Sequence, residues 1–358
     1  MYKSIVTLFC YFFIIQALFA QLDFSAEHIS SSSYFSKLDS TILAGKYEQI
    51  TSILVAKNGK VIFEKYYNGS DSNSTHNTRS ATKTMATLLT GIAIKNGYIQ
   101  SEKDKIFKYL KHKLPVQNPD KRKENITIED VLTMSSVVEC NDFNSFSRGN
   151  EERMYLIEDW TSFYLDLPIR AYTFNPKPKE QPYGRSFSYC SAGAATMAEV
   201  VQSSIRMKLD IFAKKHLFAP LGIENYTLHY TPQNTLNTAG GSEYRSRDFL
   251  KIIQMCLNGG KWNNQQIIEK SWLEKATTPK VQVFENMEYG YFFWLKRFGQ
   301  DKLYKSFYMS GNGGQKILAL PELNISVVIT TKNYGNRNAH NYTDEIMNNF
   351  VVPAIEQK

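Results

Sequence analysis

One short stretch, Ser80-Ala81-Thr82-Lys83, constrains the fold and the chemistry of this chain more than any other. Apolar residues recur behind it at helical spacing, and Gly97 stands where such a helix would end. Because residues three positions apart share a helix face, the Ser80 hydroxyl and the Lys83 amine can meet. A serine hydroxyl becomes a nucleophile when a neighbouring base takes its proton, and a partly desolvated lysine can be that base. Taken alone, these four residues are more often a helix N-cap followed by an exposed lysine.

Two further segments strengthen the chemical interpretation. Phe187-Ser188-Tyr189-Cys190-Ser191-Ala192-Gly193 lies between a Pro- and Gly-bearing loop and a run with helical periodicity. A tyrosine at such a junction can direct its hydroxyl into a cleft, although in a chain with 22 tyrosines a half-buried core position is the commoner explanation. Gly311-Asn312-Gly313-Gly314-Gln315 precedes an apolar run. Glycines at the start of a strand let a ligand approach the backbone, but, taken alone, this segment is better explained as an ordinary Gly-rich hairpin turn.

In this order, the three segments resemble the signature of the serine β-lactamase and penicillin-binding protein superfamily: S-x-x-K, then Y-x-N or S-D-N, then K-T-G or H-x-G. The chain is most similar to β-lactamase-related serine hydrolases of the class C-like, 6-aminohexanoate-dimer hydrolase type. The likeness runs from about residue 50 to the C-terminus. Further segments that carry it are 128–136, Ala239-Gly240-Gly241, Arg247-Asp248, 258–262 and Tyr289-Gly290-Tyr291.

The resemblance implies acyl transfer through a covalent serine ester. Ser80 would attack a carbonyl carbon, and Lys83 and Tyr189 would share the proton transfers. Which of these two is the general base stays open, because a coupled pair need not have a single answer. The backbone N–H groups of Ser80 and Gln315 would form the oxyanion hole.

Two positions depart from the usual signature. Ser191 stands where the family often has Asn, and a hydroxyl reaches less far than an amide. Asn312 stands where Lys or His is usual, and a neutral amide cannot attract a substrate carboxylate by charge. The resemblance therefore places Ser191, Asn312, Gly313 and Gly314 at the substrate, and it makes β-lactam turnover and C-terminal peptide recognition less expected than hydrolysis itself.

The N-terminus is typical of a secretory signal peptide over residues 1–20. Lys3 precedes an apolar run, Ile5 to Phe19, which ends at the small residue Ala20. An uncleaved membrane anchor is the alternative, although the run is short for a bilayer span. We expect an exported protein, periplasmic or extracellular, without stable membrane insertion after cleavage.

Cysteine usage and charge limit the other function classes. Cleavage would leave Cys140, Cys190 and Cys256, and an odd number leaves at least one thiol unpaired within the chain. The chain has six scattered histidines and no C-x-x-C or H-E-x-x-H, so we expect no metal and no cofactor. The formal net charge of +8 comes without a nucleic-acid-binding motif, so we expect no nucleic-acid partner. It indicates a solvated surface, or association with an anionic cell-envelope polymer.

Both ends of the chain contribute strand-forming segments, whereas the middle contributes mostly helices and loops. We predict an α/β (α+β) fold of the β-lactamase/transpeptidase type, with a five-stranded antiparallel sheet flanked by helices plus a mainly helical lobe. The domain would span 21–358, with 21–97 and 281–358 in the sheet lobe and 98–280 in the helical lobe. The predicted strands are 50–56, 61–67, 289–297, 316–320 and 325–331, and the predicted helices include 35–44 and 341–355.

The sequence thus favours an exported serine hydrolase that forms an acyl-Ser80 intermediate on a small ester or an amide/peptide-like substrate. A β-lactamase or D-alanyl-D-alanine peptidase is the first alternative. The altered Asn312 and Ser191 motivate a second alternative, a catalytically weak, penicillin-binding-like binding or sensor protein.

Overall fold

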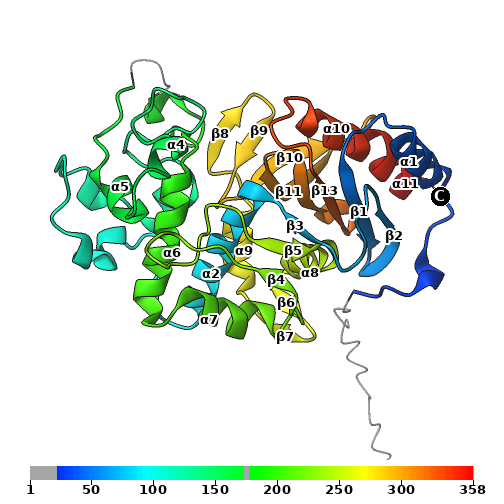
Figure 1. Ribbon diagram of the computed structural model, residues 1–358, viewed down its shortest axis with the longest axis horizontal. Coiled ribbons are helices and arrows are strands. Elements are labelled where there is room, and N and C mark those ends of the chain that lie inside the picture. The colour runs from blue at the N-terminus through cyan, green and yellow to red at the C-terminus, as the bar shows by residue number, and fades with distance from the viewer. Residues whose placement is uncertain (1–21, 173–176, 358) are drawn as a thin grey trace, which may run out of the picture.

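An eight-stranded antiparallel sheet runs through the centre of the molecule (Figure 1). The structure, a computed structural model, describes residues 22–172 and 177–357, so the predicted signal peptide lies outside the described residues. The strand order is β2-β1-β13-β12-β11-β10-β9-β8. The bounds are β1 (Ile50–Lys57), β2 (Lys60–Tyr66), β8 (Val281–Phe284), β9 (Met287–Tyr289), β10 (Trp294–Phe298), β11 (Tyr304–Gly311), β12 (Gln315–Leu320) and β13 (Ile325–Thr331).

This architecture confirms the predicted fold class, but the sheet has eight strands rather than five. The predicted strand 289–297 is divided into β9 and β10. Phe292 has a φ of 50°, which is incompatible with an extended strand. Strand β11, which the sequence did not predict, separates β10 from β12.

The two faces of the sheet pack against different helices. Alternate strand residues point to opposite faces, so Ile53 and Val55 of β1 enter one core while Leu54 enters the other. Helices α1 (Ser33–Leu43), α10 (Ala339–Ile346) and α11 (Val352–Glu356) cover the first face, and α8 (Ser246–Leu257) packs on the second against β1, β12 and β13. A π-helical segment, Met347–Val351, joins α10 to α11 within the predicted C-terminal helix.

A second group of helices surrounds α6 (Ser191–Ile205). Helix α6 contacts α2 (Lys83–Lys95), α3 (Ile128–Leu132), α4 (Glu151–Met154), α5 (Trp160–Asp166) and α7 (Leu209–Ala213), while α2 also contacts α9 (Lys270–Ala276). Beside them lie the small sheet β3 (Thr75–Asn77), β5 (Glu243–Arg245) and β4 (Tyr226–Thr227), and the hairpin β6 (Lys261–Trp262) and β7 (Gln265–Gln266). The two groups are in contact, since α2 packs on α6 and α8 packs on the sheet.

Helix α2 is buried from Lys83 to Ala93, so both of its sides face protein. Its threonines satisfy their hydroxyls on backbone carbonyls: Thr84 donates to Phe292 and Thr87 donates to Tyr291, each at 2.7 Å. These bonds tie the start of α2 to the segment between β9 and β10. The helix that carries Lys83 is therefore held on all sides.

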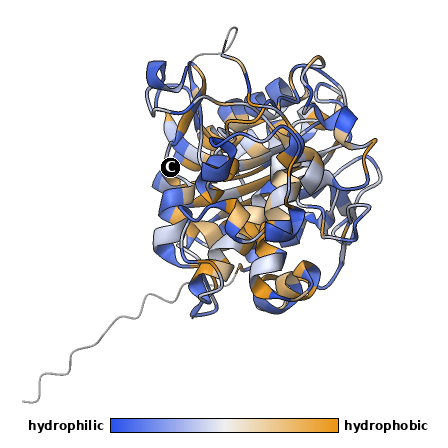
Figure 2. Cartoon of the chain, turned by 90° about the vertical axis from the view of Figure 1, so that its left-hand side faces the viewer, coloured by the Kyte–Doolittle hydropathy of each residue, from blue (hydrophilic) through white to orange (hydrophobic). Residues whose placement is uncertain are grey.

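Hydrophobic residues concentrate on the inner strands and helices, and hydrophilic residues lie mostly on the outer loops (Figure 2). Within the part of the chain that the structure describes, none of the helices combines the length and apolar character needed to cross a membrane.

Candidate active site

The predicted nucleophile and its lysine lie together. Ser80 belongs to a short 3-10 turn, Arg79–Thr82, and Lys83 is the first residue of α2. The Lys83 side chain is buried, its Nζ lies 3.0 Å from Ser80 Oγ, and it donates a 2.6 Å hydrogen bond to the Ala239 carbonyl. Arg79 has a left-handed φ of 53°, which is uncommon for a residue with a Cβ and shapes the turn that presents Ser80.

Tyr189 joins this pair from the segment before α6. Lys83 Nζ lies 5.1 Å from the centroid of the Tyr189 ring. The ring is sandwiched between two others: the Phe143 centroid lies at 5.1 Å with an interplanar angle of 7°, and that of Trp294 at 5.9 Å with 28°. Ser80 and Tyr189 both line a pocket with a volume of about 570 Å³.

The end of β11 packs directly against the Ser80 turn. A Cβ on Gly311 would lie 1.9 Å from the Thr78 carbonyl oxygen and 3.1 Å from the Ser80 nitrogen, so only glycine fits there. Strand β10 pairs with β11 only as far as Tyr308. The last residues of β11 therefore have no partner from β10 at the edge that borders the pocket.

The glycine-rich segment after β11 divides between the pocket and the core. Asn312 and Gly313 line the pocket, and Asn312 Oδ1 accepts a 2.8 Å hydrogen bond from the Gly335 N–H. Gly314 instead packs on α10, because a Cβ there would meet the Ala339 carbonyl at 2.2 Å. Gln315 is fully buried, bonds through its side chain to the Thr331 backbone and does not line the pocket.

The oxyanion role of the Gln315 N–H stays a prediction, but another backbone segment lies against Ser80. The backbone that contacts the Ser80 turn belongs to Gly311, which pairs with Gln315 across the connection between β11 and β12. The sequence could not show where β11 ended, because β11 itself was not predicted.

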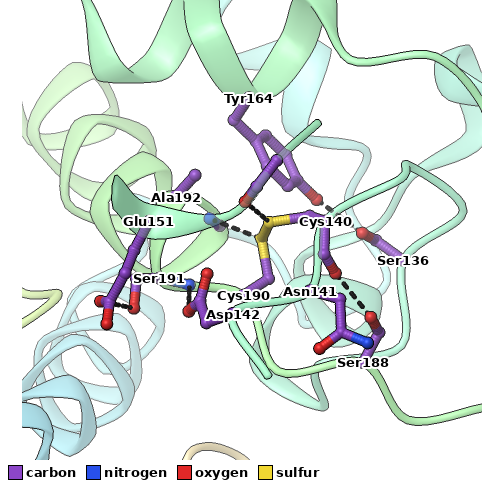
Figure 3. Close-up of a disulfide and its surroundings, with 12 residues drawn as sticks. Ser136, Cys140, Asn141, Asp142, Glu151, Tyr164, Ser188, Cys190, Ser191 and Ala192 are labelled. Atoms are coloured by element: carbon purple, nitrogen blue, oxygen red, sulfur yellow. Dashed lines mark hydrogen bonds between the residues drawn. A yellow bond between two sulfur atoms is a disulfide. The ribbon is translucent and has the colours of Figure 1, made fainter. Parts of the chain in front are cut away.

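Ser191 occupies a different place from the one expected. It is fully buried as the first residue of α6 and is not among the residues that line the pocket. Its hydroxyl donates to Glu151 Oε2 at 2.9 Å, and its N–H donates to Asp142 Oδ2 at 2.7 Å (Figure 3). Neither bond is made to Lys83, and Ser191 itself is separated from the pocket by the two carboxylates that it contacts. Ser191 thus orients two carboxylates.

Those carboxylates, Asp142 and Glu151, line the pocket and were missed by sequence reasoning. They come from a loop and from the four-residue helix α4, neither of which carries a recognisable motif. Burial raises the pKa of Asp142 to about 6; the positive charge of Lys83 opposes this shift and the negative charge of Glu151 adds to it. An acidic wall therefore faces the same pocket as Ser80.

A buried lysine borders the pocket on another side. Lys316 on β12 donates to Thr343 Oγ1 at 2.8 Å and pairs with Asp344 Oδ1 at 2.6 Å. Burial lowers the pKa of Lys316, and Asp344 opposes that effect. From the sequence, Lys316 was predicted to begin an apolar strand, and no role in the site was assigned to it.

A disulfide connects the two segments that frame the tyrosine. Cys140 and Cys190 are bonded, while Cys256 is a buried free thiol (Figure 3). Cys190 directly follows Tyr189, and Cys140 lies two residues before Asp142. The bond therefore ties the Asp142 loop to the start of α6.

Replacing both bonded cysteines by serine is expected to lower the free energy of unfolding by about 2–5 kcal/mol, because the bond closes a long loop in the unfolded chain. It should also lower turnover, since Tyr189 and Asp142 adjoin the bond. Melting temperatures with and without a reductant measure the effect: the reductant should destabilise the wild type and a Cys256→Ala control but not the double variant. Equal sensitivity in the double variant would contradict this prediction.

One surface cluster has the donor types of a metal site. Asp23, Glu27 and His28 place their ligand atoms within 4.8 Å of one another, but exposed acidic groups commonly gather without an ion.

The Ser80 pocket, in contrast, holds the groups that acyl transfer needs: a hydroxyl, a buried amine, a tyrosine and backbone at a strand end.

A serine and a lysine in hydrogen-bond contact beside a tyrosine, set at the edge of an antiparallel sheet, define an S-x-x-K serine hydrolase. The beta-lactamase family model matches residues 49–347, and the chain belongs to this family. No curated protein sequence matches the chain.

Solved structures resemble the molecule over most of its length. A protein described as a 6-aminohexanoate-dimer hydrolase from Bacillus anthracis is 16% identical with a TM-score of 0.67, covering 94% of this chain and 90% of that one. A D-stereospecific amidohydrolase from Streptomyces sp. is 14% identical with a TM-score of 0.65, covering 89% and 98%. A class C beta-lactamase mutant is 14% identical with a TM-score of 0.62, covering 89% and 96%. At these identities the likeness establishes the shared fold.

Proposed function

We propose that this protein is an exported serine hydrolase that acts through an acyl-Ser80 intermediate on a small ester or an amide/peptide-like substrate. The observation that carries the proposal is the meeting of Ser80, Lys83 and Tyr189 at one pocket, with the glycine end of β11 against the Ser80 turn. Three separate segments supply these groups, as nucleophilic catalysis requires.

In the proposed mechanism, Ser80 Oγ attacks the substrate carbonyl while its proton passes to the Lys83–Tyr189 pair. The 3.0 Å contact between Ser80 and Lys83 is within the range for proton transfer. The Ser80 N–H and the N–H of Asn312, the residue after β11, would stabilise the oxyanion in place of the Gln315 group expected from the sequence. The proton then goes to the leaving group, and water releases the acyl group from Ser80.

Two of the structural relatives are named as a 6-aminohexanoate-dimer hydrolase and an amidohydrolase, which favours an amide or ester over a β-lactam. A class C beta-lactamase shares the fold, so β-lactam hydrolysis is the competing outcome. The purified protein should be assayed against p-nitrophenyl esters, amino-acid amides and nitrocefin. If nitrocefin is turned over faster than every ester and amide, the protein is a β-lactamase and the proposal is wrong. If the protein binds penicillin but turns over no substrate, it is a binding protein.

Export is part of the proposal. The apolar N-terminus supports it, and so does the disulfide, because such bonds persist mainly outside the reducing cytoplasm. N-terminal sequencing of native protein should find a start near Gln21. Cytosolic material that begins at Met1 would oppose it.

Tyr189→Phe removes one hydroxyl and keeps the ring that packs between Phe143 and Trp294. If this hydroxyl carries protons, kcat should fall by about 10²–10⁴-fold while the melting temperature stays near that of the wild type. Tyr183→Phe is a matched control, because Tyr183 is not among the residues that line the pocket. Full turnover in Tyr189→Phe would make Tyr189 a packing residue.

A further inference from the structure

One wall of the pocket is apolar and is built on the edge of the main sheet. The β8–β9 hairpin and the first residue of β10 contribute Phe284, Met287 and Trp294 to the pocket and, among the described residues, no charged side chain. Phe284 and Met287 are paired across the hairpin, so their side chains lie on the same face of it. Glu288 does not line the pocket and instead accepts a hydrogen bond from the Tyr183 hydroxyl. The hairpin therefore presents its apolar face to the pocket.

A second segment adds aromatic surface to this wall. Phe143, from the loop before α4, is 64% exposed and stacks on Tyr189, which stacks in turn on Trp294. Phe284, the last residue of β8, is 60% exposed. In Figure 1 the β8–β9 hairpin lies between α4 and β10, beside the segment that carries Phe143. Exposed apolar surface that lines a concave pocket is typical of a ligand-binding site.

The position of Tyr189 decides which part of a substrate meets the wall. In the proposed mechanism, acylation forms the Ser80 ester and breaks the bond between the carbonyl carbon and the leaving-group oxygen. The Ser80 proton passes through the Lys83–Tyr189 pair to that oxygen, and water then releases the acid. The leaving-group oxygen must therefore come within hydrogen-bond reach of the pair. Because the Tyr189 ring is itself part of the wall, the carbon chain on this oxygen begins beside the wall.

We infer that this wall binds an apolar leaving group, so that the substrate class is esters of alcohols that carry a chain of several carbons. The inference rests on the proposed function, because only hydrolysis defines a leaving group. Phe143 and Trp294 flank the start of the chain, and Phe284 and Met287 cover its far end. The pocket, at about 570 Å³, has room for such a chain. Its binding is favourable because apolar surface of both the chain and the wall leaves water.

Two isomeric esters test the assignment in the wild-type protein. Hexyl acetate and ethyl hexanoate have the same composition and both release a primary alcohol, but they carry the long chain on opposite sides of the ester. Ethyl acetate lacks the long chain. With the released acid titrated in a pH-stat, kcat/KM for hexyl acetate should exceed that for each of the other two esters by at least about tenfold. Equal values for the three esters, or a preference for ethyl hexanoate, would overturn the inference and leave the serine hydrolase proposal standing.

Substitutions in the hairpin locate the wall. Phe284→Ala and Met287→Ala should each lower the ratio of kcat/KM for hexyl acetate to that for ethyl acetate by about threefold or more. The loss should appear mainly in KM, because the chain touches the wall both before and during the reaction. Phe146→Ala is the matched control, since Phe146 is 87% exposed and is not among the residues that line the pocket. A ratio that stays at the wild-type value in both hairpin variants would refute the assignment.

Binding to Ser80→Ala protein separates this inference from the proposed function. Saturation-transfer NMR compares 1-hexanol, the alcohol that hexyl acetate releases, with ethanol. We expect a signal from the methylene protons of 1-hexanol that weakens when Phe284→Ala is added. That result without hydrolysis of any ester by the wild type would support the wall and reject the proposed function. Turnover of ethyl acetate by the wild type without a signal from 1-hexanol would reject the wall and keep the hydrolase.

Discussion

Ser80→Ala is expected to abolish hydrolysis and covalent labelling while leaving the fold intact. The variant loses one hydroxyl from a 3-10 turn whose shape depends on Arg79 and on the contact with Gly311. Removing the nucleophile of a studied serine protease lowers kcat by on the order of 10⁶-fold. We expect a loss of that order here, because without Oγ the Lys83–Tyr189 pair has no proton to take.

Intact-mass analysis after incubation with a fluorophosphonate gives the clearest measurement. The wild type should gain one probe, the Ser80→Ala protein none, and both should melt at similar temperatures. Ser310→Ala is the matched control, because Ser310 lines the same pocket on β11 but lies outside the S-x-x-K turn. Labelling of the Ser80→Ala protein at wild-type stoichiometry would disprove the nucleophile assignment.

The features of the fold and site that depend on short-range spacing could be predicted from the sequence. Ser80 and Lys83 are three residues apart, so their contact follows from local geometry once the turn and helix form. The outer part of the sheet was also predictable, because β1 and β2 are rich in strand formers and flank an Asn-Gly turn. The family resemblance then connected segments that lie far apart in the chain.

Strand β11 escaped prediction because of its polarity pattern. Its residues are buried on both faces from Ser306 onward, so the sequence lacks the apolar–polar alternation of a half-exposed strand. Ser306 and Ser310 interrupt the apolar residues, and Gly311 ends the strand. Without β11, the backbone next to Ser80 could not be located, and Gln315 was assigned in place of the preceding turn.

The two pocket carboxylates could not be predicted from the sequence for a different reason. Asp142 reaches Ser191 because the Cys140–Cys190 bond brings its loop to the start of α6. Three cysteines remain after the predicted cleavage, and spacing alone does not show which two pair. The sequence therefore could not show that a disulfide holds the Asp142 loop next to the tyrosine.

Lys83→Met is expected to lower kcat/KM by at least about 10²–10⁴-fold, the range for losing a general acid–base group. Methionine fills a similar volume in the buried site but provides no amine for the Ser80 proton. The Ala239 carbonyl also loses its 2.6 Å donor, so some loss of stability should accompany the loss of rate. Lys83→Arg should be impaired as well, because a guanidinium stays protonated and cannot act as a base.

Steady-state and burst kinetics with a neutral p-nitrophenyl ester separate the two effects. If Lys83 activates Ser80, the rate of acylation should fall while KM changes little. Lys95→Met is the matched control, since Lys95 ends the same helix and is not among the residues that line the pocket. Because Tyr189 is the other candidate base, the Lys83→Met, Tyr189→Phe double variant decides how they act. If the double variant loses no more kcat/KM than either single variant, Lys83 and Tyr189 act as one coupled proton-transfer unit. If its fold-loss equals the product of the two single fold-losses, the two residues act in separate steps. Lys83→Met protein that folds and acylates at the wild-type rate would remove lysine from the mechanism and leave Tyr189 as the sole base.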